Sequence, residues 1–155
     1  MNNKIKILIV KLVNLEDKIL KIHDYIINNT RYDVDKTSEN SYTAIGPLFN
    51  GLSVCSGYAD LMAVFLTKFG VNNIKVSSDT HVWNAILINN EWFNIDLTWD
   101  DPVTKDSNVD TLLHQFFLIN TDKLLEFDTE ELVQETRRFD DVSGKTFAMR
   151  NKETE

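Results

Sequence analysis

Cysteine, proline and glycine are all scarce in this sequence: one Cys, two Pro and five Gly occur among 155 residues. A single cysteine excludes an intramolecular disulfide, and it excludes the paired-cysteine spacings of zinc ribbons, zinc fingers and thioredoxin-type redox sites. The cysteine and the three histidines show no H-x-x-x-H or C-x-x-C spacing, so the sequence predicts no metal site. It also contains no signal of a coenzyme or other cofactor.

Basic residues are in the minority as well, because 16 Lys and Arg stand against 24 Asp and Glu, a net charge of −8. They are scattered, so the electrostatic footprint of a DNA or RNA binder is missing. The apolar run at residues 4–15 is interrupted by Lys11, is too short to span a bilayer and lacks a cleavage site, so it predicts neither membrane insertion nor a signal peptide. Both a cytoplasmic protein and an excised domain of an exported cell-surface protein fit this pattern.

The composition, 43% hydrophobic and 26% charged, is that of an ordinary globular domain. A chain of this size buries on the order of two thirds of the surface that it exposes when unfolded, enough for a core without a disulfide. We expect a single domain over residues 1–155, with a core over about 12–134 and a charged tail over about 135–155.

The chain begins with an amphipathic helix, because apolar residues recur every three or four positions over residues 12–27. This helix is expected to end near residues 28–29, and the polar stretch 31–40 is expected to be a surface connection. The later elements predicted by pattern are a strand over 74–78, a hairpin over 81–99, a strand over 112–119 and a short helix from Thr121 or Asp122 to Leu132.

A second helix is predicted within residues 50–71. Ser53 is the expected N-cap, and Gly70 follows the end of the helix, where a left-handed residue is expected. Cys55 therefore falls in the first turn. Gly57 costs about 1 kcal/mol relative to alanine inside a helix, which indicates close approach of another backbone or of a ligand at that position.

The hairpin sequence also predicts which of its residues face each other. A two-residue turn at 89–90, where asparagine tolerates positive φ, places Ile88 opposite Glu91. Because side chains alternate between the faces of a sheet, His81 and Asp96 then become diagonal neighbours on one face, with Cα atoms roughly 7–8 Å apart. The two side chains can bridge that separation, so a carboxylate can hold an imidazole here.

A histidine held by a carboxylate is suited to activating a nucleophile. The acid fixes the tautomer and orientation of the ring, which leaves the other ring nitrogen to take a proton. Cys55, at the start of a helix, feels the positive end of the backbone dipole, and this favours the thiolate. The sequence therefore predicts a catalytic triad of Cys55, His81 and Asp96.

Three motifs that contain these residues resemble the bacterial transglutaminase-like family. They are GLSVCSGYADLMAVFLTKFGV (51–71), HVWNAILINNEWFNIDLTWDDP (81–102) and HQFFLIN (114–120), with the lead-in helix KIHDYIINNTRYD (21–33) before them. The resemblance covers residues 12–120. It implies that Cys55 is the nucleophile, His81 the general base and acid, and Asp96 the orienting carboxylate. It also implies a papain-like α+β fold, in which an N-terminal helix and the cysteine-bearing helix pack on an antiparallel sheet.

The oxyanion hole of such a site is not marked by a motif. By analogy the Cys55 backbone N–H is one donor, and the side chains of Asn50 and Tyr42 are candidates for a second. Where family members often carry an aromatic residue before the glycine upstream of the cysteine, this chain has Ile45-Gly46-Pro47.

Four further polar residues have ordinary interpretations. His23 and His114 are expected to be polar surface histidines, since that environment is far commoner than a ligand position. Asp100 and Asp101 lie between a tryptophan and a proline, a composition typical of a turn at the end of a strand. At that position they can rim the cleft.

The leading functional hypothesis is a thiol enzyme that acts on peptide or glutamine-type amide bonds through an acyl-enzyme, with hydrolysis favoured over crosslinking. The cleft, for which Trp83 and Trp99 are the expected walls, would receive a protein or peptide. A catalytically silent peptide-binding or scaffold module with the same fold is the alternative, and a transferase with a thioester donor is a third. The substrate is not encoded in a readable motif, because specificity lies in loops such as 33–50 and 100–111.

Overall fold

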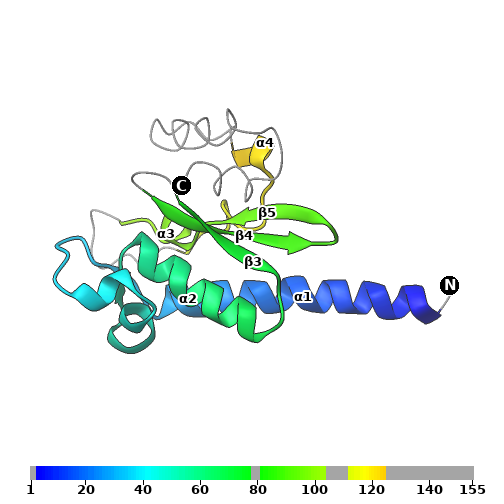
Figure 1. The fold of residues 1–155 in the computed structure, drawn as a ribbon, viewed down its shortest axis with the longest axis horizontal. Coiled ribbons are helices and arrows are strands. Elements are labelled where there is room, and N and C mark those ends of the chain that lie inside the picture. Colours follow the sequence, from blue (N-terminus) through cyan, green and yellow to red (C-terminus); the bar gives the residue numbers. More distant parts are fainter. Residues whose placement is uncertain (1–2, 78–80, 104–111, 125–155) are drawn as a thin grey trace.

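The computed structural model describes residues 3–77, 81–103 and 112–124, and it has the predicted α+β architecture with an antiparallel sheet (Figure 1). The predicted helix end at Leu132 and the predicted tail 135–155 lie outside the described residues. The helices are α1 (Asn3–Asn28), η1 (Glu39–Tyr42), η2 (Gly46–Asn50), α2 (Cys55–Lys68), α3 (Leu97–Asp100) and α4 (Thr121–Leu124). The strands are β1 (Arg31–Tyr32), β2 (Leu52–Ser53), β3 (Asn73–Ser77), β4 (Val82–Ile88) and β5 (Glu91–Ile95). None of the described helices is both long enough and apolar enough to cross a membrane.

The helices α1 and α2 cover one face of the three-stranded sheet (Figure 1). Their apolar stripes meet the strand residues in one buried cluster: Ile19, Ile22, Ile26, Ile27, Tyr58, Leu61, Met62, Leu66, Val71, Ile86, Ile88, Ile95 and Leu97. Each fully buried Leu or Ile side chain stabilises the fold by roughly 1.5–3 kcal/mol. This cluster therefore fixes α2, and with it Cys55, against the sheet.

The predicted C-terminal end of α2 is confirmed, whereas its predicted N-cap is not. Gly70 has φ +74°, the left-handed conformation expected just beyond a helix. At the other end, Val54 is the N-cap and makes no side-chain capping bond, while the Ser53 hydroxyl donates to the Val54 carbonyl (2.8 Å). The predicted Ser53 cap is thus wrong, because this hydroxyl lies one residue too early to reach the first N–H groups of the helix.

The hairpin of β4 and β5 has the predicted register, with Ile88 opposite Glu91. Asn89 and Asn90 form the turn with φ values of +52° and +64°. β3 pairs with the other edge of β4, so the antiparallel order is β3-β4-β5. The face of the sheet away from α1 and α2 carries a second apolar cluster of Val76, Trp83, Ala85, Phe116 and Leu124.

Two predicted extended segments are not strands. Residues 97–99 belong to the helical turn α3, because Asp96 caps that turn by accepting a hydrogen bond from the Trp99 N–H (3.1 Å). The stretch 112–119 contributes only an isolated bridge between Asn94 and Ile119. Its Leu118 has φ +51°, which breaks an extended strand.

Residues 31–40, predicted to be a polar surface connection, begin with β1, which pairs in parallel with β2. The buried Asp33 follows, and its carboxylate accepts hydrogen bonds from Thr37, from the Ser38 N–H and from the Ser41 hydroxyl. The Ser41 carbonyl in turn accepts the Val54 N–H at the start of α2 (2.9 Å). This loop therefore holds the backbone that precedes Cys55.

Gly57 lies where this loop crosses α2, and the predicted close approach of another backbone is confirmed. A Cβ at Gly57 would collide with the Ser41 carbonyl oxygen and the Ser53 hydroxyl. Because the first of these is backbone, we expect Gly57→Ala to lower the free energy of unfolding by about 1–3 kcal/mol, the usual range for overpacking. Urea denaturation measures this change. The control is Val64→Ala, at an exposed site on the same helix, and its unfolding free energy should stay within about 0.5 kcal/mol of the parent. Equal urea midpoints for the parent, the control and Gly57→Ala would show that the loop can shift to accommodate the methyl group without loss of stability.

Candidate active site

Cys55 is the first residue of α2 and is half-buried with a free thiol. Val54 before it is extended, with φ −102° and ψ 179°, so the helical conformation begins at the cysteine itself. The first hydrogen bond of the helix runs from the Gly57 N–H to the Val54 carbonyl (3.0 Å), so the N–H groups of Cys55 and Ser56 have no carbonyl partner within the helix. These N–H groups offer hydrogen-bond donors to an anion beside the sulfur.

His81 lies immediately before β4 and is 5% exposed. Its Nε2 donates to Oδ2 of Asp96 over 2.6 Å, and Asp96 is also 5% exposed. The other carboxylate oxygen, Oδ1, accepts the Trp99 N–H that caps α3. Both carboxylate oxygens of Asp96 are thus held by hydrogen bonds. The bond to His81 joins the two side chains that the predicted hairpin register made diagonal neighbours.

The protonated form of His81 is strongly favoured. Burial lowers the pKa of this imidazole, but the charge and hydrogen bond of Asp96, together with the hydrogen bond and charge of Cys55, raise it to about 11. Because Nε2 is used by Asp96, Nδ1 is the ring nitrogen left for Cys55. At neutral pH the site therefore holds an imidazolium between a carboxylate and the cysteine sulfur.

Two indole rings flank the His81 imidazole. Trp83 stacks on it with ring centroids 5.6 Å apart and planes 21° apart, and Trp99 lies 5.2 Å away at 32°. Aromatic faces within about 6 Å of a cation stabilise it by roughly 0.5–2 kcal/mol. The two residues predicted as cleft walls thus both contact His81, and Trp83, at 3% exposure, is buried beneath the ring.

Trp99 also lines a pocket of about 460 Å³, which Trp83, Cys55 and His81 do not. The wall is mostly apolar and consists of Tyr32, Thr98, Trp99, Asp101, Pro102, Val103, Leu113, Gln115 and Phe116. Asp101 accepts a hydrogen bond from the Tyr58 hydroxyl of α2 (2.5 Å). Trp99 thus lies between this pocket and His81.

The two side chains predicted as further oxyanion donors have other surroundings. Tyr42 is 45% exposed, and its carbonyl accepts the Ser56 hydroxyl (2.9 Å), which places the Tyr42 backbone beside the first turn of α2. Asn50 is exposed at the end of η2, and its Oδ1 accepts a hydrogen bond from Asn40. These contacts assign neither side chain to an oxyanion site.

Two residues expected at the surface are fully buried. His23 and Asp100 are both 0% exposed, and Nε2 of His23 donates to Oδ2 of Asp100 over 2.8 Å. Burial raises the pKa of Asp100, while the His23 bond and the Phe116 N–H oppose that rise. The predictions of a surface histidine and of a turn aspartate at the cleft rim are therefore wrong, because the pair ties α1 to α3 inside the protein.

The sequence of residues 9–97 matches the family described as the transglutaminase-like superfamily. This is more than half of the 155 residues, so the chain belongs to that superfamily. The matched range includes Cys55, His81 and Asp96 and stops before the HQFFLIN motif. A comparison with curated proteins found no match.

Solved structures similar to this chain include the following two. One, from Cytophaga hutchinsonii, is described as a candidate cysteine protease; it is 20% identical, has a TM-score of 0.43, and the similarity covers 52% of this chain and 30% of that one. The other is described as a TGase, with 17% identity, a TM-score of 0.46, and coverage of 71% of this chain and 37% of that one. The chain thus spans about a third of the length of each, and the family assignment rests on the sequence match.

Proposed function

We infer that this protein is a cysteine-nucleophile acyl-transfer enzyme that acts on peptide or glutamine-type amide bonds. The single observation that carries the proposal is the buried imidazole of His81, which is hydrogen-bonded to Asp96 on one side and to Cys55 on the other. An imidazolium paired with a cysteine at a helix start is the arrangement that activates a thiol and can protonate a leaving amine. Membership in the transglutaminase-like superfamily supports the same chemistry.

In the first half-reaction the Cys55 thiolate attacks the amide carbonyl, and a C–S bond forms. The negative charge moves to the carbonyl oxygen, for which the Cys55 backbone N–H at the start of α2 is the proposed donor; one such donor typically contributes a factor of about 10²–10³ in rate. His81 then gives its Nδ1 proton to the leaving nitrogen as the C–N bond breaks. A thioester remains on Cys55.

In the second half-reaction a water molecule attacks the thioester, His81 takes one of its protons, and the acid leaves with regeneration of the thiolate. We propose hydrolysis ahead of crosslinking because water needs no binding site, whereas crosslinking needs a second site for an amine. The apolar pocket beside Trp99 favours an apolar substrate side chain near the attacked bond. The expected substrate is accordingly a protein or peptide.

Profiling with peptide libraries and a free amine tests this proposal. The protein is incubated with the library, and cleaved, deamidated and amine-coupled products are separated by mass spectrometry. Release of shorter peptides or of ammonia, together with a Cys55-linked acyl adduct, is the expected result. A library left intact, with no adduct on Cys55, would instead support a silent peptide-binding module.

Alkylation of Cys55 at low pH reports on the thiolate directly. At pH 6 a free cysteine is almost entirely protonated, whereas a thiolate paired with the His81 imidazolium reacts. We expect iodoacetamide to label Cys55 about 10- to 100-fold faster than free cysteine at pH 6. Rates are read by intact-protein mass spectrometry, and labelling no faster than free cysteine would count against an activated thiol.

A further inference from the structure

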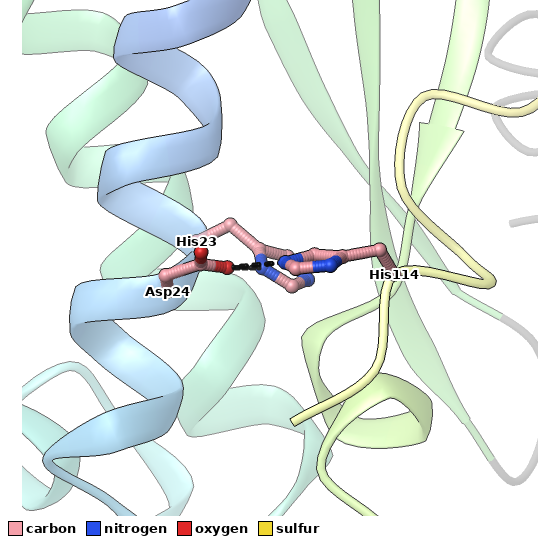
Figure 2. Close-up of side chains that lie close together, drawn as sticks. All are labelled: His23, Asp24 and His114. Atoms are coloured by element: carbon pink, nitrogen blue, oxygen red, sulfur yellow. Dashed lines mark hydrogen bonds and ion pairs between the residues drawn. The ribbon is translucent and has the colours of Figure 1, made fainter.

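A second cluster of ionisable side chains lies away from Cys55, where α1 meets the segment 112–120. Figure 2 shows His23 and Asp24 of α1 facing His114. Asp24 Oδ1 accepts from His23 Nδ1 (2.8 Å) and from His114 Nε2 (2.7 Å). One nitrogen or oxygen atom from each of the three residues lies within 4.8 Å of the other two. Two imidazoles and a carboxylate thus converge on one point.

Each ring nitrogen of His23 faces a carboxyl group. Its Nδ1 faces the carboxylate of Asp24 and its Nε2 faces that of Asp100, and both contacts are 2.8 Å long. A metal ion bound at Nδ1 would leave Nε2 free to keep its buried hydrogen bond to Asp100, so one ring can serve both contacts.

We propose that His23 Nδ1, Asp24 Oδ1 and His114 Nε2 bind a divalent transition-metal ion of the Zn²⁺ type. Nitrogen and carboxylate ligands in this combination are typical of zinc sites with three protein ligands. Asp100 occupies the position of the carboxylate that commonly accepts the second N–H of a metal-bound histidine. This site uses none of the residues of the proposed triad, so it is independent of the proposed function.

The local geometry suits such an ion with a small adjustment. Zinc ligands at about 2.0–2.1 Å in a tetrahedron lie roughly 3.3 Å apart, so the present contacts must open by about half an ångström. His114 can move by that amount because its side chain is 46% exposed, and Asp24 is 29% exposed. The exposed side leaves room for water as a fourth ligand. Phe117 packs edge-on against both imidazoles, with ring centroids 5.3 Å and 6.2 Å away.

The ion would join parts of the chain that are distant in sequence. His114 and Asp24 are 90 residues apart, and His23 reaches Asp100 of α3, 77 residues away. α3 begins at the Asp96 cap that also holds His81. Metal binding therefore braces the segment 112–120 and α3 against α1, and the expected consequence is a rise in thermal stability.

Calorimetric titration with Zn²⁺ alone tests the site, and it is done in a Cys55→Ala background so that the thiol does not compete for the ion. We expect one equivalent to bind and the thermal midpoint to rise. His114→Ala and Asp24→Asn each alter an exposed or half-exposed ligand, so both should fold, and each should weaken binding by at least 10-fold. Asp17→Asn, on the exposed surface of α1, is the matched control and should bind as the parent does.

Two outcomes would overturn the proposal: no stoichiometric Zn²⁺ binding, or binding that His114→Ala and Asp24→Asn leave unchanged. Asp100→Asn adds a test of the carboxylate behind His23, for which a 10- to 100-fold loss of metal affinity is the usual size of effect. Substituted Co²⁺ gives a spectroscopic check in the parent protein. A spectrum without a thiolate-to-cobalt charge-transfer band supports the His-Asp-His site, and a strong thiolate band would assign the ion to Cys55 instead.

Discussion

Cys55→Ala is expected to lower the rate of amide cleavage by about 10⁴-fold or more, because it removes the atom that forms the acyl-enzyme. The side chain is half-buried at the first position of α2, and alanine suits a helix, so the fold should persist. The rate is measured on the best peptide from library profiling. Intact-protein mass spectrometry of the same samples should show loss of the acyl adduct.

The control for this variant is Val64→Ala, which truncates an exposed side chain on the same helix and should keep the parent rate. His81→Ala and the double variant complete the series. Since the two residues act as a unit, the double variant should be scarcely slower than either single variant. A Cys55→Ala protein that retained the parent rate would remove the proposed nucleophile, whatever the behaviour of His81.

The hairpin was the part of the fold most fully predicted from the sequence, since its determinants are local. Two asparagines with positive φ set the turn, and alternation of side chains then sets every pairing out to Asn84 and Ile95. The same count places His81 and Asp96 on one face, where their side chains form a hydrogen bond. The helix that carries Cys55 was predicted for a similar reason, from an apolar stripe and a terminating glycine.

The errors arose where a tertiary contact overrides the local pattern. Residues 97–99 continue the β-rich composition of the hairpin, but the Asp96 carboxylate caps them into a helical turn. The apolar stretch 112–119 looks like a strand, although a short apolar run has no periodicity that separates a strand from other buried structure. In the folded chain Phe116 and Ile119 are instead packed against the Trp83 side of the sheet.

The residues of the metal-site proposal were not predictable from spacing. His23 and His114 each look like an isolated surface histidine, and their partners lie 77 and 90 residues away in the chain. A motif search can detect ligands only when one local element presents several of them. Here a helix presents two, and a distant loop presents the third.

Asp96→Asn is expected to reduce the rate of amide cleavage by about 10²–10⁴-fold while preserving the fold. Asparagine is as good an N-cap as aspartate, so its oxygen can keep the bond from the Trp99 N–H. Its amide nitrogen then faces His81 Nε2 as a donor, which forces the ring proton onto Nδ1, toward Cys55. In that tautomer the imidazole cannot hold the thiol proton, and rapid alkylation at pH 6 should disappear as well.

The pH dependence of stability distinguishes this electrostatic role from a structural one. The folded-state pKa of His81 is raised from 6.5 to about 11, so its contribution is complete below pH 6.5 and is lost as the pH rises toward 11. We therefore expect the unfolding free energy of the parent to decline more steeply than that of Asp96→Asn between about pH 8.5 and 10. Urea titrations at each pH measure the slope of unfolding free energy against pH for both proteins. Parallel slopes would mean that Asp96 acts only as the cap of α3. The variant Asp96→Ala lacks the cap, and its loss of about 0.5–2 kcal/mol measures that structural effect.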